Sequence, residues 1–206
     1  MQAAAIDTPE LTRPREPDRD VRLILHNVSW GRYVLIRGLL EDQPGLRMTY
    51  LEGTLEIMSR SRQHEREKKV VARLIEAWAL LRRVHLNGYG STTFRRESKE
   101  RGAEPDECYV IGRAHADDSD EVPDIALEVI VSSGGIDKLD VYRGLGVPEV
   151  WFFRDGAFEL HRLQGEAYER IERSALLPEL DLAHLASFTT YADQTDAVLA
   201  YVDSLR

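Results

Sequence analysis

Apolar residues recur every three to four positions through residues 59–83, and charged residues fill the positions between them. This spacing predicts a long amphipathic helix with one buried stripe. The stripe consists of Val70, Val71, Leu74, Ile75, Trp78 and Leu81. The same periodicity predicts helices at 29–42, 180–188 and 194–206.

Other segments have the patterns of strands. Residues 124–133, DIALEVIVSS, are nearly continuously apolar, as in a strand that is buried on both faces. Residues 45–58 contain two short apolar runs around EGT, which predicts a hairpin. Further strands are expected in 87–95, 104–112 and 147–171, a polar loop at 113–123 and a short helix at 135–146. The order of elements predicts an α/β fold with a central mixed β-sheet flanked by α-helices.

Composition indicates one globular domain. Hydrophobic residues make up 43% of the 206 positions, which is typical of a chain with a substantial core. Residues 1–20 are rich in proline and charge, so we expect a flexible tail there and a single domain over 21–206. With one cysteine, Cys108, the chain has no intrachain disulfide, and we expect a reducing, cytoplasmic location. No run of about 18 apolar residues predicts a membrane span.

The net charge of −9 argues against nucleic-acid binding over the whole surface, but it leaves room for a local basic stripe. The many carboxylates also suit hard metal ions, which prefer oxygen ligands.

Two acidic residues of the apolar strand, Asp124 and Glu128, fall on the same face by alternation. Four strand steps separate them by roughly 13 Å, too far to share one ion. Asp106, at the start of the strand in 104–112, is a better partner for Glu128 if the two strands pair. The alternative is that Asp106 and Asp124 only mark strand starts, and that Glu128 pairs with an arginine.

Lys138 follows the turn SSGG at 132–135, which lets the chain reverse sharply. The first turn of the next helix would then direct Lys138 toward Glu128, where an ammonium group can orient water or stabilise developing charge. A solvated lysine between Asp137 and Asp140 is the structural alternative.

His64 and Glu65 begin the long helix, where a glutamate suits the helix dipole in a purely structural role. The functional alternative places them beside a metal ion. Arg62 and Lys68 in the same segment, and Arg95 and Arg96 in the segment FRRESKERG, which we expect to be a loop, are candidate contacts to nucleic acid. Such clusters also occur simply as solvated surface.

Three ordered segments together resemble the Uma2 family of endonucleases, within the PD-(D/E)xK nuclease superfamily. They are TYLEGTLEIMSRSRQHE, EPDECYVIG and PDIALEVIVSSGGIDKLDVYRGLGVPEVWFF. The resemblance covers about residues 25–205 and implies a restriction-endonuclease-like core. Arg60 departs from the pattern, because the family commonly has proline after Met-Ser.

The resemblance implies that Asp106 and Glu128 are the metal-binding acidic pair and that Lys138 is a catalytic lysine displaced onto the following helix. His64 and Glu65 match supporting positions, and Asp124 matches a second Pro-Asp.

The resulting expectation is an endonuclease that depends on Mg²⁺ or Mn²⁺ and hydrolyses DNA, in which Asp106 and Glu128 hold the metal. The alternative is a binding or regulatory module that keeps the nuclease fold without activity. No membrane partner is expected, and a homodimer is a third possibility.

Overall fold

The computed structural model describes residues 19–40, 42–43, 45–114, 121–132 and 134–206. The expected tail at 1–20 therefore lies outside the described residues except for its last two, and most of the expected loop at 113–123 does so as well. Within the described residues, no helix is both long and apolar enough to cross a membrane.

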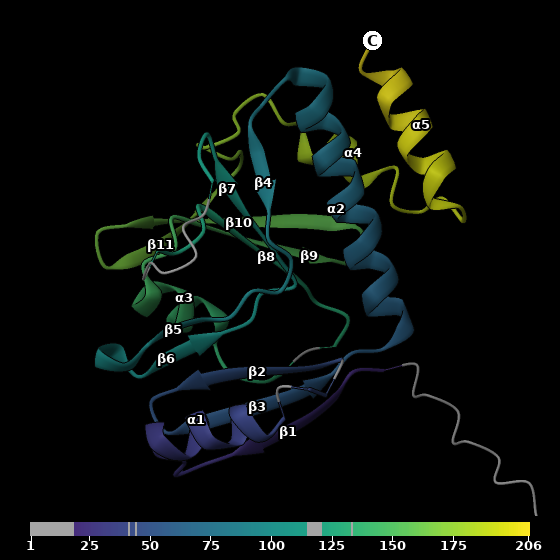
Figure 1. The fold of residues 1–206 in the computed structure, drawn as a ribbon. Coiled ribbons are helices and arrows are strands. Elements are labelled where there is room, and N and C mark those ends of the chain that lie inside the picture. The colour runs from purple at the N-terminus through teal and green to yellow at the C-terminus, as the bar shows by residue number, and fades with distance from the viewer. Residues whose placement is uncertain (1–18, 41, 44, 115–120, 133) are drawn as a thin grey trace, which may run out of the picture.

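Two β-sheets lie one above the other (Figure 1). The lower sheet, here called sheet A, is antiparallel and has the order β1-β3-β2-β6-β5. Its strands are β1 (Val21–Leu25), β2 (Leu46–Leu51), β3 (Thr54–Ser59), β5 (Phe94–Arg96) and β6 (Arg101–Ala103). A 3₁₀ turn, η1 (Glu97–Lys99), joins β5 to β6.

The second sheet, sheet B, is mixed and has the order β11-β10-β9-β8-β7-β4. Only β8 and β9 pair in parallel, because helix α3 (Lys138–Leu145) crosses between them. The strands are β4 (Leu86–Gly88), β7 (Glu107–Ile111), β8 (Ile125–Val129), β9 (Glu149–Arg154), β10 (Ala157–Gln164) and β11 (Ala167–Ile171).

Helices cover both faces of sheet B, and one helix covers the outer face of sheet A (Figure 1). On one face of sheet B lies α2 (Arg62–Arg82) with α4 (Leu182–Ala186) and α5 (Gln194–Ser204), and on the other lies α3. Helix α1 (Trp30–Leu39) packs on sheet A through Tyr33, which stacks on Tyr50.

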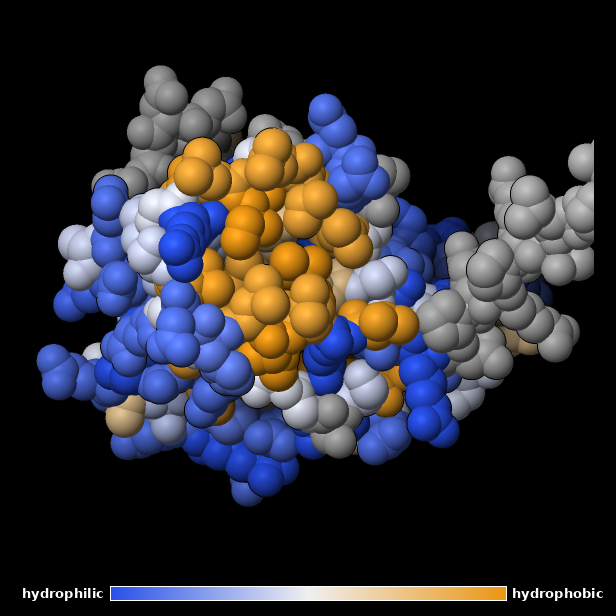
Figure 2. Space-filling model, turned by 90° about the horizontal axis from the view of Figure 1, so that it is seen from below, coloured by the Kyte–Doolittle hydropathy of each residue, from blue (hydrophilic) through white to orange (hydrophobic). Residues whose placement is uncertain are grey.

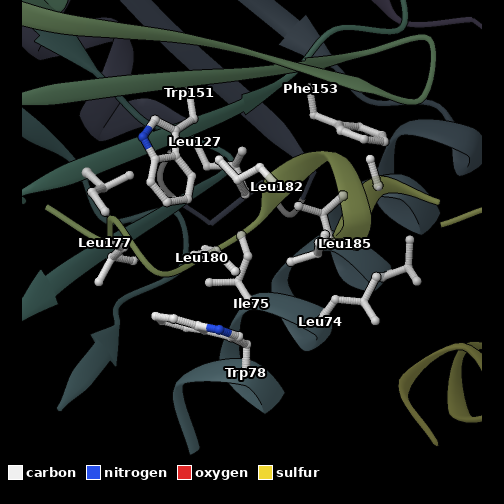
Figure 3. Packing of buried hydrophobic residues seen from close by; sticks show 14 of the residues in the cluster. Leu74, Ile75, Trp78, Leu127, Trp151, Phe153, Leu177, Leu180, Leu182 and Leu185 are labelled. Atoms are coloured by element: carbon white, nitrogen blue, oxygen red, sulfur yellow. The ribbon is translucent and has the colours of Figure 1, made fainter. Parts of the chain in front are cut away.

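The main core lies between α2, α4 and sheet B (Figure 3). Leu74, Ile75 and Trp78 of the α2 stripe point toward Leu127, Trp151 and the leucines of the C-terminal segment. Five members of the expected stripe are buried, whereas Leu81 near the end of the helix is 37% exposed. The buried members are Val70, Val71, Leu74, Ile75 and Trp78.

Strand β8 alternates as expected. Ile125, Leu127 and Val129 enter the α2 core, whereas Ala126 belongs to the smaller core around α3. Glu128 therefore faces the α3 side, where the site described below lies.

The α/β class, the mixed sheet and the flanking helices are confirmed by the structure. Two local expectations were wrong. The segment FRRESKERG is not a loop but forms β5, η1 and β6, and residues 87–95 are split between β4 in one sheet and β5 in the other. Short strands with few apolar residues give too weak an alternation for the sequence to reveal them.

A buried carboxylate fixes the loop after β11. Glu149, at the start of β9, accepts hydrogen bonds from Trp151 Nε1 at 3.0 Å and Ser174 Oγ at 2.7 Å. It also accepts from the backbone N–H groups of Ala175 and Leu176. The four hydrogen-bond donors compensate the cost of burying this carboxylate, and they hold the C-terminal segment against sheet B.

Candidate functional site

The Asp106 carboxylate is fully buried at the junction of β3, α2, β7 and β8. Its Oδ2 accepts a hydrogen bond from the backbone N–H of Val129 at 2.7 Å and lies 3.0 Å from His64 Nε2. Its Oδ1 forms an ion pair with the guanidinium of Arg60, whose side chain is also buried. Each carboxylate oxygen of Asp106 thus faces a positive or donor group of the chain.

His64 lies between two carboxylates. Its Nδ1 is 2.9 Å from Asp20 Oδ2, and the other oxygen of Asp20 accepts a hydrogen bond from the Ser61 backbone N–H at 2.9 Å. Burial alone would lower the pKa of His64, but the two aspartates raise it above its usual value. Burial would likewise raise the pKa of Asp106, yet His64 and Arg60 hold it at about 2.

Glu128 is the second buried carboxylate of the site. Its Oε1 lies 3.2 Å from Lys138 Nζ and accepts a very short hydrogen bond from Tyr142 Oη. Lys138 and Tyr142 are four residues apart on α3, so both side chains lie on the same face of that helix. Burial raises the pKa of Glu128, and Lys138 opposes that increase.

The strand register places the two carboxylates opposite each other. β7 pairs with β8 in antiparallel fashion, with Glu107 facing Leu127. One step further along, Asp106 stands opposite Glu128, and directly opposed residues point to the same side of a sheet. The environments push the pKa values of Asp106 and Glu128 in opposite directions, which is a feature of acid–base sites.

Sheet A provides the opposite wall of the site. Lys138 Nζ donates to Thr49 Oγ1 at 2.8 Å, and Thr49 is the register partner of Glu56 on β3. Glu56 is buried, and its Oε2 accepts a hydrogen bond from the Ile136 backbone N–H at 3.1 Å. Glu56 therefore holds the turn that leads into α3.

Gly135 allows this contact. A Cβ atom at position 135 would come within 2.1 Å of Glu56 Oε2, and the residue has φ +106°. Gly134 has a similar φ of +101°, but a Cβ there would meet nothing within 4 Å. Only one of the two glycines is thus required for space, although both have a backbone conformation that favours glycine.

A cavity of about 280 Å³ opens onto this cluster. Glu128, Lys138 and Glu56 line it together with two arginines, Arg22 of β1 and Arg154 at the end of β9. Arg22 donates to the Gly134 carbonyl at 2.7 Å, which brings β1 against the glycine turn. Fully buried Asp106 does not line the cavity and lies behind Glu128.

The structure separates two of the expected residues from Glu128. Asp124 Oδ2 accepts from the Ile111 backbone N–H at 2.8 Å and from Arg113 at 2.7 Å, so it fixes the start of β8. Glu65 is half exposed and lies 3.3 Å from Arg60. It therefore joins the Asp106 network only through that arginine.

The candidate nucleic-acid contacts fall into two groups. Arg62 and Lys68 lie on α2, where Lys68 Nζ is 3.9 Å from Glu65. Arg95 and Arg96 lie on β5 and line a separate groove of about 820 Å³ beside α1. Their roles stay predictions.

Several site residues were not found from the sequence. Glu56 has the same signal as Glu128, a carboxylate inside an apolar strand, within LEIM. Tyr142 could have been found from its spacing of four from Lys138. Arg60 was not recognised as the partner of Asp106, which is 46 positions away.

The site offers few ligands for a divalent cation. Among the described residues, no three His, Cys, Asp or Glu side chains form a cluster that could hold a metal. Two opposed carboxylates remain, and Mg²⁺ commonly binds through one or two carboxylates together with water and substrate phosphates. Asp106 Oδ1 is buried and has no hydrogen bond of good geometry within the described chain. Asp106 and Glu128 therefore fit such an ion only if Arg60 moves away from Asp106.

Comparison with known proteins identifies the family of this chain. The profile of the Uma2 family, described as "Putative restriction endonuclease", matches residues 35–192. This range covers most of the chain and includes Asp106, Glu128 and Lys138. The chain therefore belongs to the Uma2 family.

One similar solved structure is described as a crystal structure of a putative nuclease belonging to DUF820 from Anabaena variabilis. It is 14% identical, the match covers 75% of this chain and 90% of that chain, and the TM-score is 0.39. At this level the likeness carries no inference about activity. A search of curated proteins gave no match.

Replacing Gly135 by alanine tests the fit of Glu56 against the turn. Because the new Cβ would overlap Glu56 Oε2, we expect Gly135→Ala to lower the free energy of unfolding by about 1–3 kcal/mol more than Gly134→Ala does. Gly134→Ala is the matched control, since it carries the same φ strain without the overlap. Urea denaturation measures both, and equal losses would contradict the contact.

A second prediction concerns pH. The pKa of His64 is raised on folding, so its stabilising effect is complete below its ordinary value of about 6.5. That effect is lost as pH rises through the higher pKa of the folded protein. We expect His64→Gln to remove part of the decline in urea midpoint between neutral and alkaline pH, measured with EDTA present. Exposed His85→Gln is the control, and an unchanged slope in His64→Gln would contradict the network.

Proposed function

We propose that this chain is a metal-dependent nuclease that hydrolyses phosphodiester bonds of DNA. The observation that carries the proposal is the Glu128–Lys138 pair, which lines the cavity while Asp106 stands opposite Glu128 on the neighbouring strand. A carboxylate, a cation and a second carboxylate at one strand end are the groups that metal-assisted phosphoryl transfer uses. Membership of the Uma2 family supports the same reaction class.

The residues that line or support the cavity would have separate roles in this reaction. Lys138 is held by Glu128 and Thr49, so its ammonium group is oriented before substrate arrives. There it would stabilise the negative charge that develops on the phosphate. Arg154 and Arg22 on the cavity wall have the planar guanidinium groups that bind phosphate oxygens. Tyr142 keeps its proton, because burial and Glu128 raise its pKa well above the usual value.

Mg²⁺ or Mn²⁺ would be held by Glu128 and Asp106. When bound, such an ion would polarise the phosphate and lower the pKa of a bound water. Arg60 now neutralises the Asp106 charge, so binding requires this guanidinium to withdraw, and half-exposed Glu65, which lies 3.3 Å from Arg60, offers it an alternative partner. His64 and the Val129 N–H would keep Asp106 in position during that exchange.

A second candidate function is a nuclease-fold binding module without activity. One observation favours it, namely that Arg60 already compensates Asp106 in the way that a metal would. Metal titration separates the two functions, because a module of this kind needs no divalent ion.

We expect the protein to cleave plasmid DNA with Mg²⁺ or Mn²⁺. Glu128→Gln should abolish cleavage, and Lys138→Met should reduce its rate about a hundredfold or more, because each removes a preorganised charge. Exposed Glu172→Gln is the control and should cut normally. Folding of each variant is checked by circular dichroism. Cleavage that survives in a double Asp106→Asn, Glu128→Gln variant would rule out the proposed site.

Removing the Arg60 charge should strengthen metal binding. A cation about 5 Å from a metal position opposes binding by a few kcal/mol at an effective dielectric constant of about 20. We therefore expect Arg60→Met to raise Mn²⁺ affinity at least about tenfold in calorimetric titration. The variant should also be less stable without metal, because Asp106 loses its partner.

Arg101→Met is the matched control, since Arg101 is also buried and pairs with Glu52 away from the site. It should lose stability without gaining Mn²⁺ affinity. If neither the wild type nor Arg60→Met binds Mn²⁺ while both are folded, the non-catalytic function is favoured instead.

A further inference from the structure

An apolar face covers the outer side of sheet A, opposite the site. Figure 2 looks onto this side and shows a broad continuous hydrophobic area with few polar interruptions. Its most exposed members, here called the α1–β1 face, come from the edge strand and the helix that lies over the sheet. They are Val21, Leu23, Val34, Leu35 and Leu39.

Helix α1 is apolar on two sides. Its inner side buries Tyr33 against Tyr50 and completes the hydrophobic core of sheet A. Its outer side leaves Leu35 68% and Leu39 82% exposed. A surface helix of a monomer normally has polar residues on that side, so a helix that is apolar on both sides is the kind expected to be buried on both sides.

Strand β1 is an edge strand of sheet A. Among the described strands, β3 is its only neighbour, so its outer backbone groups have no strand partner. Edge strands are usually guarded by charged side chains, a proline, a bulge or a covering element. The one charged residue within β1 is Arg22, and it is turned inward, where it contacts Met58 and the Gly134 carbonyl.

We propose that a second copy of this chain docks on the α1–β1 face. The exposed fractions of its five residues correspond to roughly three whole aliphatic side chains, on the order of 500 Å² of apolar surface. A standard interface buries about 800 Å² on each partner, so this face with its surrounding backbone supplies most of what a stable dimer needs. Leu23 lies at the centre of β1, and a twofold axis there pairs Val21 of one copy with Leu25 of the other.

The chain's own N-terminal segment is a poorer occupant. Residues 1–18 contain only three large aliphatic residues, Met1, Ile6 and Leu11, among prolines and charges. Such a segment offers less apolar surface than the face exposes, whereas a second copy offers an identical apolar surface.

The docked face and the site share one strand. β1 presents Leu23 to the α1–β1 face, and the next side chain back along the strand, Arg22, lines the site cavity. Asp20, directly before the strand, holds His64. Docking of a second copy would therefore hold Arg22 and Asp20 in place by holding β1 in place. Any effect of docking on catalysis rests on the proposed function.

Sedimentation velocity over a range of concentrations tests the interface on the full chain. We expect a dimer for the wild type, and Leu39→Glu and Leu23→Glu should each weaken association at least about tenfold, because a symmetric interface buries the new charge twice. Leu80→Glu is the matched control, since Leu80 on α2 is also 82% exposed but lies outside the face. It should remain dimeric, and circular dichroism confirms that each variant is folded.

Hydrogen exchange provides a second readout that does not depend on a substitution. The amides of Val21–Leu25 should exchange more slowly in the dimer than at dilutions where monomer prevails. A wild-type monomer at all concentrations overturns the proposal, as does a dimer that survives both Leu23→Glu and Leu39→Glu. Dimerisation that appears only after deletion of residues 1–18 would overturn it too, because that segment would then be the occupant. None of these outcomes depends on DNA cleavage, so the proposed function can fail independently.

Discussion

The burial of the Asp106 carboxylate is the constraint on which the rest of the site depends. A carboxylate removed from water must be compensated, and here the compensation comes from Arg60, His64 and the backbone of Val129. Those partners belong to the junction of β3 with α2, to α2 itself and to β8. The groups that compensate the buried Asp106 charge therefore join sheet A, the long helix α2 and the centre of sheet B at a single point.

Glu128 stands in front of this point and is compensated differently. Its partners, Lys138 and Tyr142, both come from α3, and the position of α3 depends on the glycine turn that Glu56 holds. The inner carboxylate is thus locked by the scaffold, whereas the outer one lines a cavity and pairs with Lys138. This division suits the nuclease chemistry proposed for a member of the Uma2 family, with one acidic group fixed and one available to react.

The sequence was sufficient for elements with strong periodicity. The buried stripe of α2 and the alternation in β8 follow from local spacing, and the same alternation identified the face on which Glu128 lies. The turn before α3 was also predictable, because two glycines followed by Asp137 form a recognisable helix start. The short strands β1, β5 and β6 were missed because runs of three to five residues carry little pattern. Arg60 and Glu56 were missed as site residues because their partners are distant in sequence, and only the packing of the two sheets brings them together.

We propose that Asp106 and Glu128 form one cation site from which Arg60 must withdraw. Anomalous diffraction from a crystal soaked in Mn²⁺ tests this proposal most directly. We expect a manganese peak between the two carboxylates, with the Arg60 side chain turned away from Asp106 toward Glu65. A folded protein in which saturating Mn²⁺ gives no peak there, and Arg60 still contacts Asp106, would contradict it.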